Sequence, residues 1–251
     1  MLTITMASAA EMQHTKMKML IHCEQMLSGI LCIKGLMQGK EMLLIKTGVG
    51  AKRAGAAARQ IIKHSAPAFV LALGAAGAAD ASLKVGDIVV IKRNMQRSGL
   101  HVAGDDAFSL KAFHALKKAG LPVIFGDCVT LNRFIHLQAE KKNIFETSSA
   151  HVIDMESAAI AQVLCAKGIP FLNIRVVSDT AGEDTVDLES LFKNRKGPGS
   201  AAAGLYFLKK PSELLRAFKL KKNVRKVSVV ISEIVEILVK EPFLNSTYRT
   251  D

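Results

Sequence analysis

The chain's most informative stretch is Asn173-Ile-Arg-Val-Val-Ser-Asp-Thr-Ala-Gly-Glu-Asp184, in which an apolar run leads directly into Ser178 and Asp179. A buried strand that ends in a carboxylic acid points to a ligand site, because ligands of open α/β sheets bind at the carboxyl ends of the strands. The stretch therefore predicts a strand of a central sheet with a functional acid at its mouth.

A second acid lies at the end of another apolar run. The segment Asp154-Met-Glu-Ser-Ala-Ala159 follows the apolar residues from His151 and then takes up helical spacing through Glu156. We expect Glu156 and Asp179 to point into one crevice. A structural explanation stays open, in which Glu156 is an amino-terminal helix acid favoured by the helix dipole and Asp179 caps the next segment.

The composition bounds the class of protein. The chain has 251 residues, of which 49% are hydrophobic, enough for one buried core, so we expect a single α/β domain over residues 1–251. No apolar run reaches the roughly 18 residues of a membrane span, and no basic region precedes the first apolar residues. These features predict a cytoplasmic protein.

The four cysteines are scattered without metal-ligand spacing, which predicts buried thiols and no metal site.

The formal net charge of +12 is concentrated near the carboxyl end. A helical basic tail is expected at about residues 192–251. Between residues 193 and 226 the basic residues are Lys193, Arg195, Lys196, Lys209, Lys210, Arg216, Lys219, Lys221, Lys222, Arg225 and Lys226, against the single acid Glu213. Such a surface either attracts anions or simply solvates the protein. Interleaved leucines and phenylalanines also leave open an amphipathic element that contacts an anionic membrane.

Alternating periodicity predicts strands separated by helices, hence a mixed sheet covered on both faces. The expected strands are Leu2–Ala7, Gly29–Leu36 and Glu41–Lys46 as a hairpin, Ala68–Leu73, Asp87–Lys92, Val123–Leu131, His151–Met155 and Phe171–Val177. The expected helices are Ala51–His64, Asp105–Ala119, Glu156–Lys167 and an amphipathic run Val224–Lys240 that packs on the sheet.

Two glycine turns follow apolar strands: Thr47-Gly-Val-Gly50 and Gly74-Ala-Ala-Gly77. Glycine lets backbone N–H groups approach an anion or a sugar closely. Neither turn is a Walker loop, and the dinucleotide pattern G-x-G-x-x-G is absent. Close packing of backbone against a helix would explain both turns equally well.

Five segments in order give the chain a family resemblance. They are a first strand leading to Glu11, Thr47-Gly-Val-Gly50, Ala72-Leu-Gly-Ala-Ala-Gly-Ala-Ala-Asp80 with Leu83-Lys-Val-Gly-Asp-Ile-Val-Val90, Asp154-Met-Glu-Ser157 and Arg175-Val-Val-Ser-Asp179. From residue 2 to about 191 the chain resembles the nucleoside phosphorylase and nucleosidase family, which includes purine nucleoside phosphorylase and methylthioadenosine/S-adenosylhomocysteine nucleosidase. The resemblance implies a three-layer α/β sandwich with a mixed, twisted central sheet flanked by helices, and a homo-oligomer.

The resemblance also implies a reaction, the cleavage of an N-glycosidic bond through an oxocarbenium-like ribosyl transition state. Asp179 matches the acid that protonates N7 of the base, and Ser178 orients it. Glu156 matches the carboxylate that binds the ribose hydroxyls and favours the developing cation, with Met155 under the sugar. An acid at position 179 suggests adenine. The other residues assigned to the substrate are Phe134, Ile135, Ala76 and Gly77.

The nucleophile is left open between water and phosphate. Glu11 and Arg175 match residues that position water in the nucleosidases, whereas Gly48 and Gly50 could hold either water or phosphate. The missing hydroxyl at Ala76 favours hydrolysis. The arginines considered for a phosphate contact are Arg53, Arg93 and Arg97. Phosphate as a co-substrate is the one cofactor considered.

Beyond Asp179 the chain is most similar to hopanoid-biosynthesis-associated phosphorylases, through Gly197-Pro-Gly199 and Lys209-Lys-Pro211. That similarity favours phosphorolysis. The alternative from another class is a non-catalytic nucleotide- or nucleic-acid-binding protein on the same fold, for which a pI of 9.6 would be suitable. The joint presence of Glu11, Glu156, Arg175 and Asp179 favours the enzyme, with no nucleic acid as partner, because a mere binder of anions has no need for three acids.

Overall fold

A computed structural model describes residues 1–188, 190 and 210–244. Its strands are β1 (Leu2–Met6), β2 (Leu20–Leu27), β3 (Ile30–Met37), β4 (Lys40–Lys46), β5 (Val70–Ala78), β6 (Ile88–Gln96), β7 (His101–Ala103), β8 (Val123–Thr130), β9 (Val152–Asp154) and β10 (Phe171–Asp179). Its helices are α1 (Ala9–Met17), α2 (Ala51–Ser65), α3 (Asp106–Lys118), α4 (Gln138–Ser148), α5 (Ser157–Cys165) and α8 (Pro211–Leu238), followed by a short 3₁₀ turn at Pro242–Leu244.

The described strands form one mixed sheet in the order β10-β6-β8-β9-β5-β1-β4-β3-β2, with β7 paired to β6. Strand β10 also pairs with β5 in parallel, and β9 pairs with both β5 and β8. Five strands, β5, β10, β6, β8 and β9, therefore close into a ring, while β1, β4, β3 and β2 extend the sheet to one side. The carboxyl ends of the parallel strands β1, β4, β5 and β10 meet at one edge.

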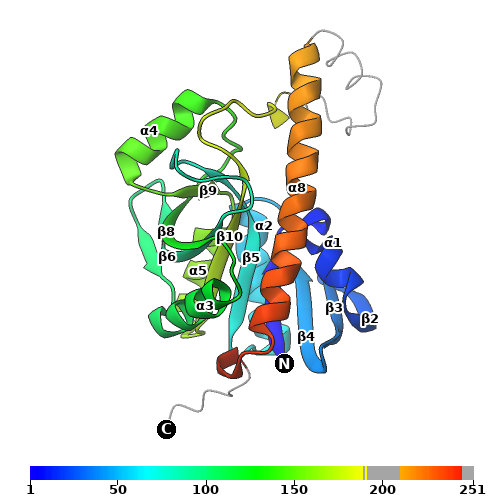
Figure 1. Cartoon of the computed structure of the whole chain (residues 1–251). Coiled ribbons are helices and arrows are strands. Elements are labelled where there is room, and N and C mark those ends of the chain that lie inside the picture. Colours follow the sequence, from blue (N-terminus) through cyan, green and yellow to red (C-terminus); the bar gives the residue numbers. More distant parts are fainter. Residues whose placement is uncertain (189, 191–209, 245–251) are drawn as a thin grey trace.

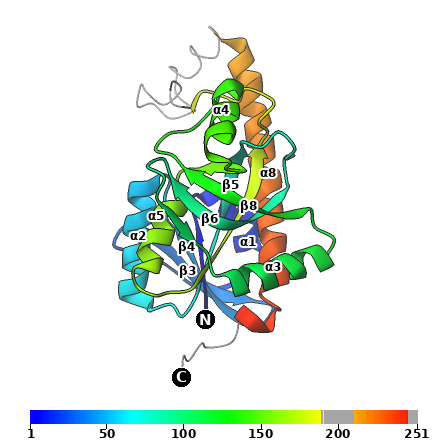
Figure 2. The same cartoon turned by 90° about the vertical axis from the view of Figure 1, so that its left-hand side faces the viewer.

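Helices cover both faces of the sheet, as the two views show (Figures 1 and 2). Helices α1, α3 and α8 lie on one face, and α2 and α5 pack together on the other. The face under α8 is the main core, where Ile231, Ile234 and Leu238 meet β-strand residues such as Leu71 and Ile174. The three-layer α/β fold expected from the sequence is confirmed, and so is the packing of the amphipathic run Val224–Lys240 on the sheet.

Local sequence signals explain most elements. The β3–β4 hairpin turns at Gln38 and Gly39, both with positive φ, which glycine adopts without strain. Strand β10 continues to Asp179, two residues beyond the expected end at Val177. Four observed elements, α1, β2, β7 and α4, were not predicted from the sequence. Helix α1 is set by a capping box between Ser8 and Glu11, β2 is an exposed edge strand, and within α4 the buried residue is a lysine rather than an apolar face.

Three further expectations bear on the fold. Cys32 and Cys128 are buried, but Cys23 and Cys165 are exposed, so the prediction of four buried thiols was wrong for these two. Cys23 is exposed because it lies on the edge strand β2, whose residues are almost all exposed, and Cys165 is the last residue of α5. The expected loop at Gly197-Pro-Gly199, the basic residues Lys193 to Lys209 and the segment 245–251 lie outside the described residues. No helix in the described part of the chain is long and apolar enough to span a membrane.

Candidate functional site

Glu11 is held at the carboxyl edge of the sheet by the start of α1. Ser8 and Glu11 form a capping box, with the Ser8 N–H donating to Glu11 Oε2 at 2.7 Å. The other carboxylate oxygen, Oε1, accepts the Ala75 N–H at 2.8 Å. One acid therefore ties the turn after β1 to the glycine turn within β5, and its side chain is buried there.

Arg175 lies in the middle of β10 and is buried against Asp154 from β9. Its Nε donates to Asp154 Oδ2 at 2.9 Å, and both side chains are almost fully buried. Burial alone would raise the pKa of Asp154, but the Arg175 charge and the donors Ser157 and Thr130 hold that pKa below its usual range. Burial alone would likewise lower the pKa of Arg175, but Asp154 raises it, so the pair is ionised.

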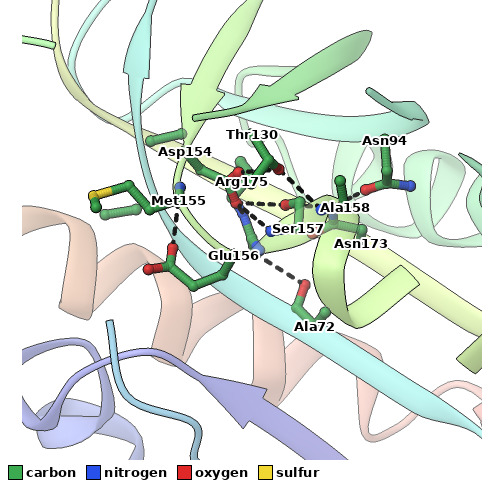
Figure 3. Close-up of polar contacts among 12 residues, drawn as sticks. Ala72, Asn94, Thr130, Asp154, Met155, Glu156, Ser157, Ala158, Asn173 and Arg175 are labelled. Atoms are coloured by element: carbon green, nitrogen blue, oxygen red, sulfur yellow. Dashed lines mark hydrogen bonds and ion pairs between the residues drawn. The ribbon is translucent and has the colours of Figure 1, made fainter. Parts of the chain in front are cut away.

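A chain of polar side chains fixes this ion pair (Figure 3). Asp154 accepts the Thr130 hydroxyl at 2.7 Å on Oδ1 and the Ser157 N–H at 2.9 Å on Oδ2. The Ser157 hydroxyl also donates to Asp154 and accepts from Asn173 Nδ2 at 2.8 Å. Because nearly every donor and acceptor around the pair is satisfied, the Arg175 guanidinium is held in a fixed position against Asp154.

Glu156 follows β9 and occupies the N-cap position of α5. Its side chain points away from α5 and toward α2, where its Oε1 accepts the Gly50 N–H at 2.6 Å. Burial and the nearby Asp154 charge raise the pKa of Glu156 to about 7. Because Gly50 is the N-cap residue of α2, the Glu156 carboxylate lies at the amino-terminal end of a helix, and the helix-dipole explanation for this acid stays open.

Glu11, Arg175 and Glu156 converge on one small cavity. A Cβ placed on Gly74 would lie 3.2 Å from both Arg175 Nη1 and Glu11 Oε1, so the second glycine turn is where these two groups approach each other. All three side chains line a cavity of about 10 Å³ together with Thr47. That volume corresponds to about one water molecule.

Asp179 sits apart from this cavity. Its Oδ1 accepts the Ser178 hydroxyl at 2.7 Å, and its Oδ2 accepts Lys141 Nζ at 2.5 Å. The carboxylate packs on Gly77, where a Cβ would lie 3.0 Å from Oδ2. Lys141 also donates to the Thr180 carbonyl at 2.9 Å. Asp179 thus makes a buried ion pair rather than a cap for the next segment.

The sequence-predicted acids line two neighbouring cavities. Glu156 lines the water-sized cavity, whereas Asp179 lines a cavity of about 350 Å³ beside α8. That both acids face one bound ligand stays a prediction. Lys141 was missed, since a lysine in a polar helix carries no signal of burial.

The other assigned residues lie around these groups. Ile135 is buried against Val129 and lines a cavity of about 980 Å³ next to α4, whereas Phe134 and Met155 are half-buried. The Ala76 carbonyl accepts the Ser178 hydroxyl at 3.2 Å. Gly48 has a positive φ, and the side chain of Arg53 packs close to it.

Of the three arginines considered for a phosphate contact, Arg53 packs beside Gly48, and the other two lie in other surroundings. Arg93 is engaged by Asp127, with Nη2 and Oδ2 2.6 Å apart. Arg97 lines the 980 Å³ cavity and not the water-sized one. Gly50, the residue considered for holding phosphate through its N–H, donates that N–H to Glu156.

Comparisons with known proteins agree with this architecture. A family model described as the phosphorylase superfamily matches residues 2–203. The 5'-methylthioadenosine/S-adenosylhomocysteine nucleosidase of Shewanella putrefaciens is 32% identical over 206 residues, covering 73% of this chain and 88% of that protein. The Geobacillus kaustophilus protein of the same name is 30% identical, covering 65% of this chain and 77% of the relative.

Solved structures share the fold at lower identity. The futalosine hydrolase of Helicobacter pylori superposes with a TM-score of 0.77 at 17% identity, covering 95% of this chain and 97% of that chain. A 5'-methylthioadenosine/S-adenosylhomocysteine nucleosidase from Neisseria meningitidis, in complex with methylthio-immucillin-A, gives 0.76 at 22% identity, covering 95% and 98%.

Proposed function

The chain belongs to the phosphorylase superfamily, and on this premise we propose that it hydrolyses the N-glycosidic bond of an adenine nucleoside. Relatives named as nucleosidases cover two thirds or more of both chains, and the protein is an enzyme that cleaves nucleoside-like compounds. No cofactor is needed, because water is the second reactant. The identity of the base as adenine and the roles of individual residues are proposals.

The observation that carries hydrolysis is the water-sized cavity between Glu11, Arg175 and Glu156. The two carboxylates would repel a phosphate, and the charge of Arg175 is already matched by Asp154. A water molecule held there would have Glu11 as an acceptor for its proton, which is the arrangement that general base catalysis requires.

The same contacts support the roles of the two other acids. As the glycosidic bond breaks, positive charge develops on the ribosyl group, and an anionic Glu156 in a buried setting would stabilise it. The ribose hydroxyls would donate to the carboxylate that now accepts the Gly50 N–H. Asp179, at the other end of the site, would face the imidazole edge of the leaving base, where the electron pair of the broken bond is neutralised by a proton.

The test is adenine release from a panel of 5'-substituted adenosines, with and without phosphate, in water enriched in ¹⁸O. We expect release without phosphate and one ¹⁸O atom at the anomeric carbon of the sugar. A strict requirement for phosphate, with a sugar phosphate as product, would refute hydrolysis. Glu11→Gln should abolish release, whereas Glu24→Gln, a matched change in the half-exposed Lys16–Glu24 surface pair, should leave it unchanged.

Two further proposals concern partners. We expect a homo-oligomer, which size-exclusion chromatography with light scattering would detect.

We also expect contact with an anionic membrane through the amino-terminal half of α8, which extends past the body in Figure 1. That half exposes Leu215 and Phe218, at 72% and 61%, on the same helix as the basic residues Lys221 and Lys222.

A further inference from the structure

Lys141 is the most unusual buried group in the described part of the chain. Its side chain is 0% exposed, although lysine is almost never fully buried without a partner. It comes from α4, whose other residues are exposed or half-buried. An ammonium group therefore anchors this helix to the body, where an apolar side chain would be usual.

The partner of this ammonium is Asp179. Lys141 Nζ lies 2.5 Å from Asp179 Oδ2 and 2.9 Å from the Thr180 carbonyl oxygen. Asp179 Oδ1 accepts the Ser178 hydroxyl, so both carboxylate oxygens accept hydrogen bonds. The ammonium is thus the group in contact with this carboxylate that carries protons to donate.

Other charges nearby are already matched. Glu183 bonds to Lys219 and Thr180, and Asp184 and Glu213 bond to Arg216. The pKa of Glu183 is lowered mainly by its hydrogen bond to Lys219 and also by the nearby charge of Lys141. Asn223 of α8 donates to the Ser178 carbonyl at 2.9 Å. Among the described groups around Asp179, Lys141 is thus the cation in direct contact with its carboxylate.

We propose that Lys141 is a positioning residue that holds Asp179 in place and stores the proton destined for the leaving base. The inference rests on the proposed hydrolysis. As the bond between the sugar and N9 breaks, its electron pair moves into the purine. The Asp179 carboxylate takes a proton from the Lys141 ammonium, which becomes a neutral amine, and passes that proton to N7. Glu11 takes a proton from the attacking water and releases it to solvent, and the amine regains a proton from solvent, so the cycle balances.

The first test compares Lys141→Met with Lys142→Met, a change of the neighbouring exposed lysine on the same helix. Lys141→Met should lower turnover by roughly 10²-fold, the scale of a lost general acid, with a smaller change in KM, and should move the alkaline limb of the pH profile to lower pH. Lys142→Met should match the wild type. A Lys141→Met enzyme with wild-type turnover and pH profile would overturn the proposal.

A double variant keeps the test decisive if Lys141→Met folds poorly. Lys141→Met with Asp179→Asn removes both charges at once, and it should be no slower than Asp179→Asn alone because Lys141 acts through Asp179. Losses that multiply would show that Lys141 works independently, which contradicts the inference.

Chemical rescue separates the charge from the space. In Lys141→Ala, added propylammonium should restore part of the lost turnover, whereas butanol of similar size should not. Equal rescue by both would mean that Lys141 only fills volume, and the proposal would fail.

A measurement without substrate separates this inference from the proposed function. Protein labelled with ¹⁵N-lysine should show one solvent-protected ammonium signal in the free enzyme, lost in Lys141→Met and shifted in Asp179→Asn. If the wild type released no adenine while this signal behaved as expected, the proposed function alone would fail. Absence of the signal would remove the ion pair and the inference with it.

Discussion

Replacing Glu156 by Gln should make the protein more stable at pH 8 and much less active. The pKa of this buried carboxyl is raised from 4.5 to about 7, so the folded state binds a proton more tightly than the unfolded state does. Stability from this group is present below pH 4.5 and is lost as pH rises through 7. A pKa shift of this size lowers the free energy of unfolding of the wild type by about 3 kcal/mol once the pH is above 7. The Gln side chain stays neutral, so the variant keeps that stability.

The assay is thermal unfolding of wild type and Glu156→Gln at pH 5 and pH 8. At pH 5 the two should unfold at similar temperatures, because Glu156 is protonated in the folded wild type. At pH 8 the variant should melt roughly 6–12 °C higher for a domain of this size. Glu24→Gln serves as the control, since that half-exposed side chain should show no such pH-dependent gain.

A stability difference that is the same at both pH values would refute the reasoning, because it would come from packing and not from ionisation. A variant that is less stable at pH 8 would show that the Gly50 N–H bond to the Glu156 anion outweighs the cost of burial. Activity should fall in either case. An enzyme that keeps a destabilising charge at neutral pH is consistent with the use of that charge on the sugar.

Three other outcomes are expected. Asp179→Asn should preserve the fold and cut adenine release by roughly 10²-fold or more, whereas near-normal turnover would remove Asp179 from the mechanism. Arg175→Met should lower the free energy of unfolding by about 3–5 kcal/mol in urea titrations, because it leaves Asp154 buried without its cation; an unchanged midpoint would contradict the buried pair. Binding to anionic vesicles in sedimentation assays should rise with anionic lipid, fall with salt, and weaken when Lys221 and Lys222 are reversed in charge, and no binding at low salt would refute the membrane contact.

Several elements could be predicted from the sequence because their signals are local. The apolar run before Asp179 and the turn at Gln38 and Gly39 depend on residues within a few positions of each other. The same holds for the helix that follows Gly50. Periodicity reports which side chains leave water, and it does so without knowledge of the neighbours.

The arrangement of the site depended on contacts that no local pattern carries. Glu156 follows the carboxyl end of β9, which pairs in parallel with β8 and antiparallel with β5. Its carboxylate then accepts the Gly50 N–H from a distant part of the chain. Ring closure through β10 and β5 decides this geometry, and it joins residues about a hundred positions apart.

The sequence by itself determined the acids, the glycine turns and the three layers, since each follows from residue type and short-range spacing. Only the tertiary structure decided that Glu11, Arg175 and Glu156 enclose a space for one water and that Asp179 faces a lysine instead. The physical reason is that the burial of a charge depends on its partner. Lys141 looks like any surface lysine until folding brings α4 to the end of β10 and Asp179 offers its carboxylate.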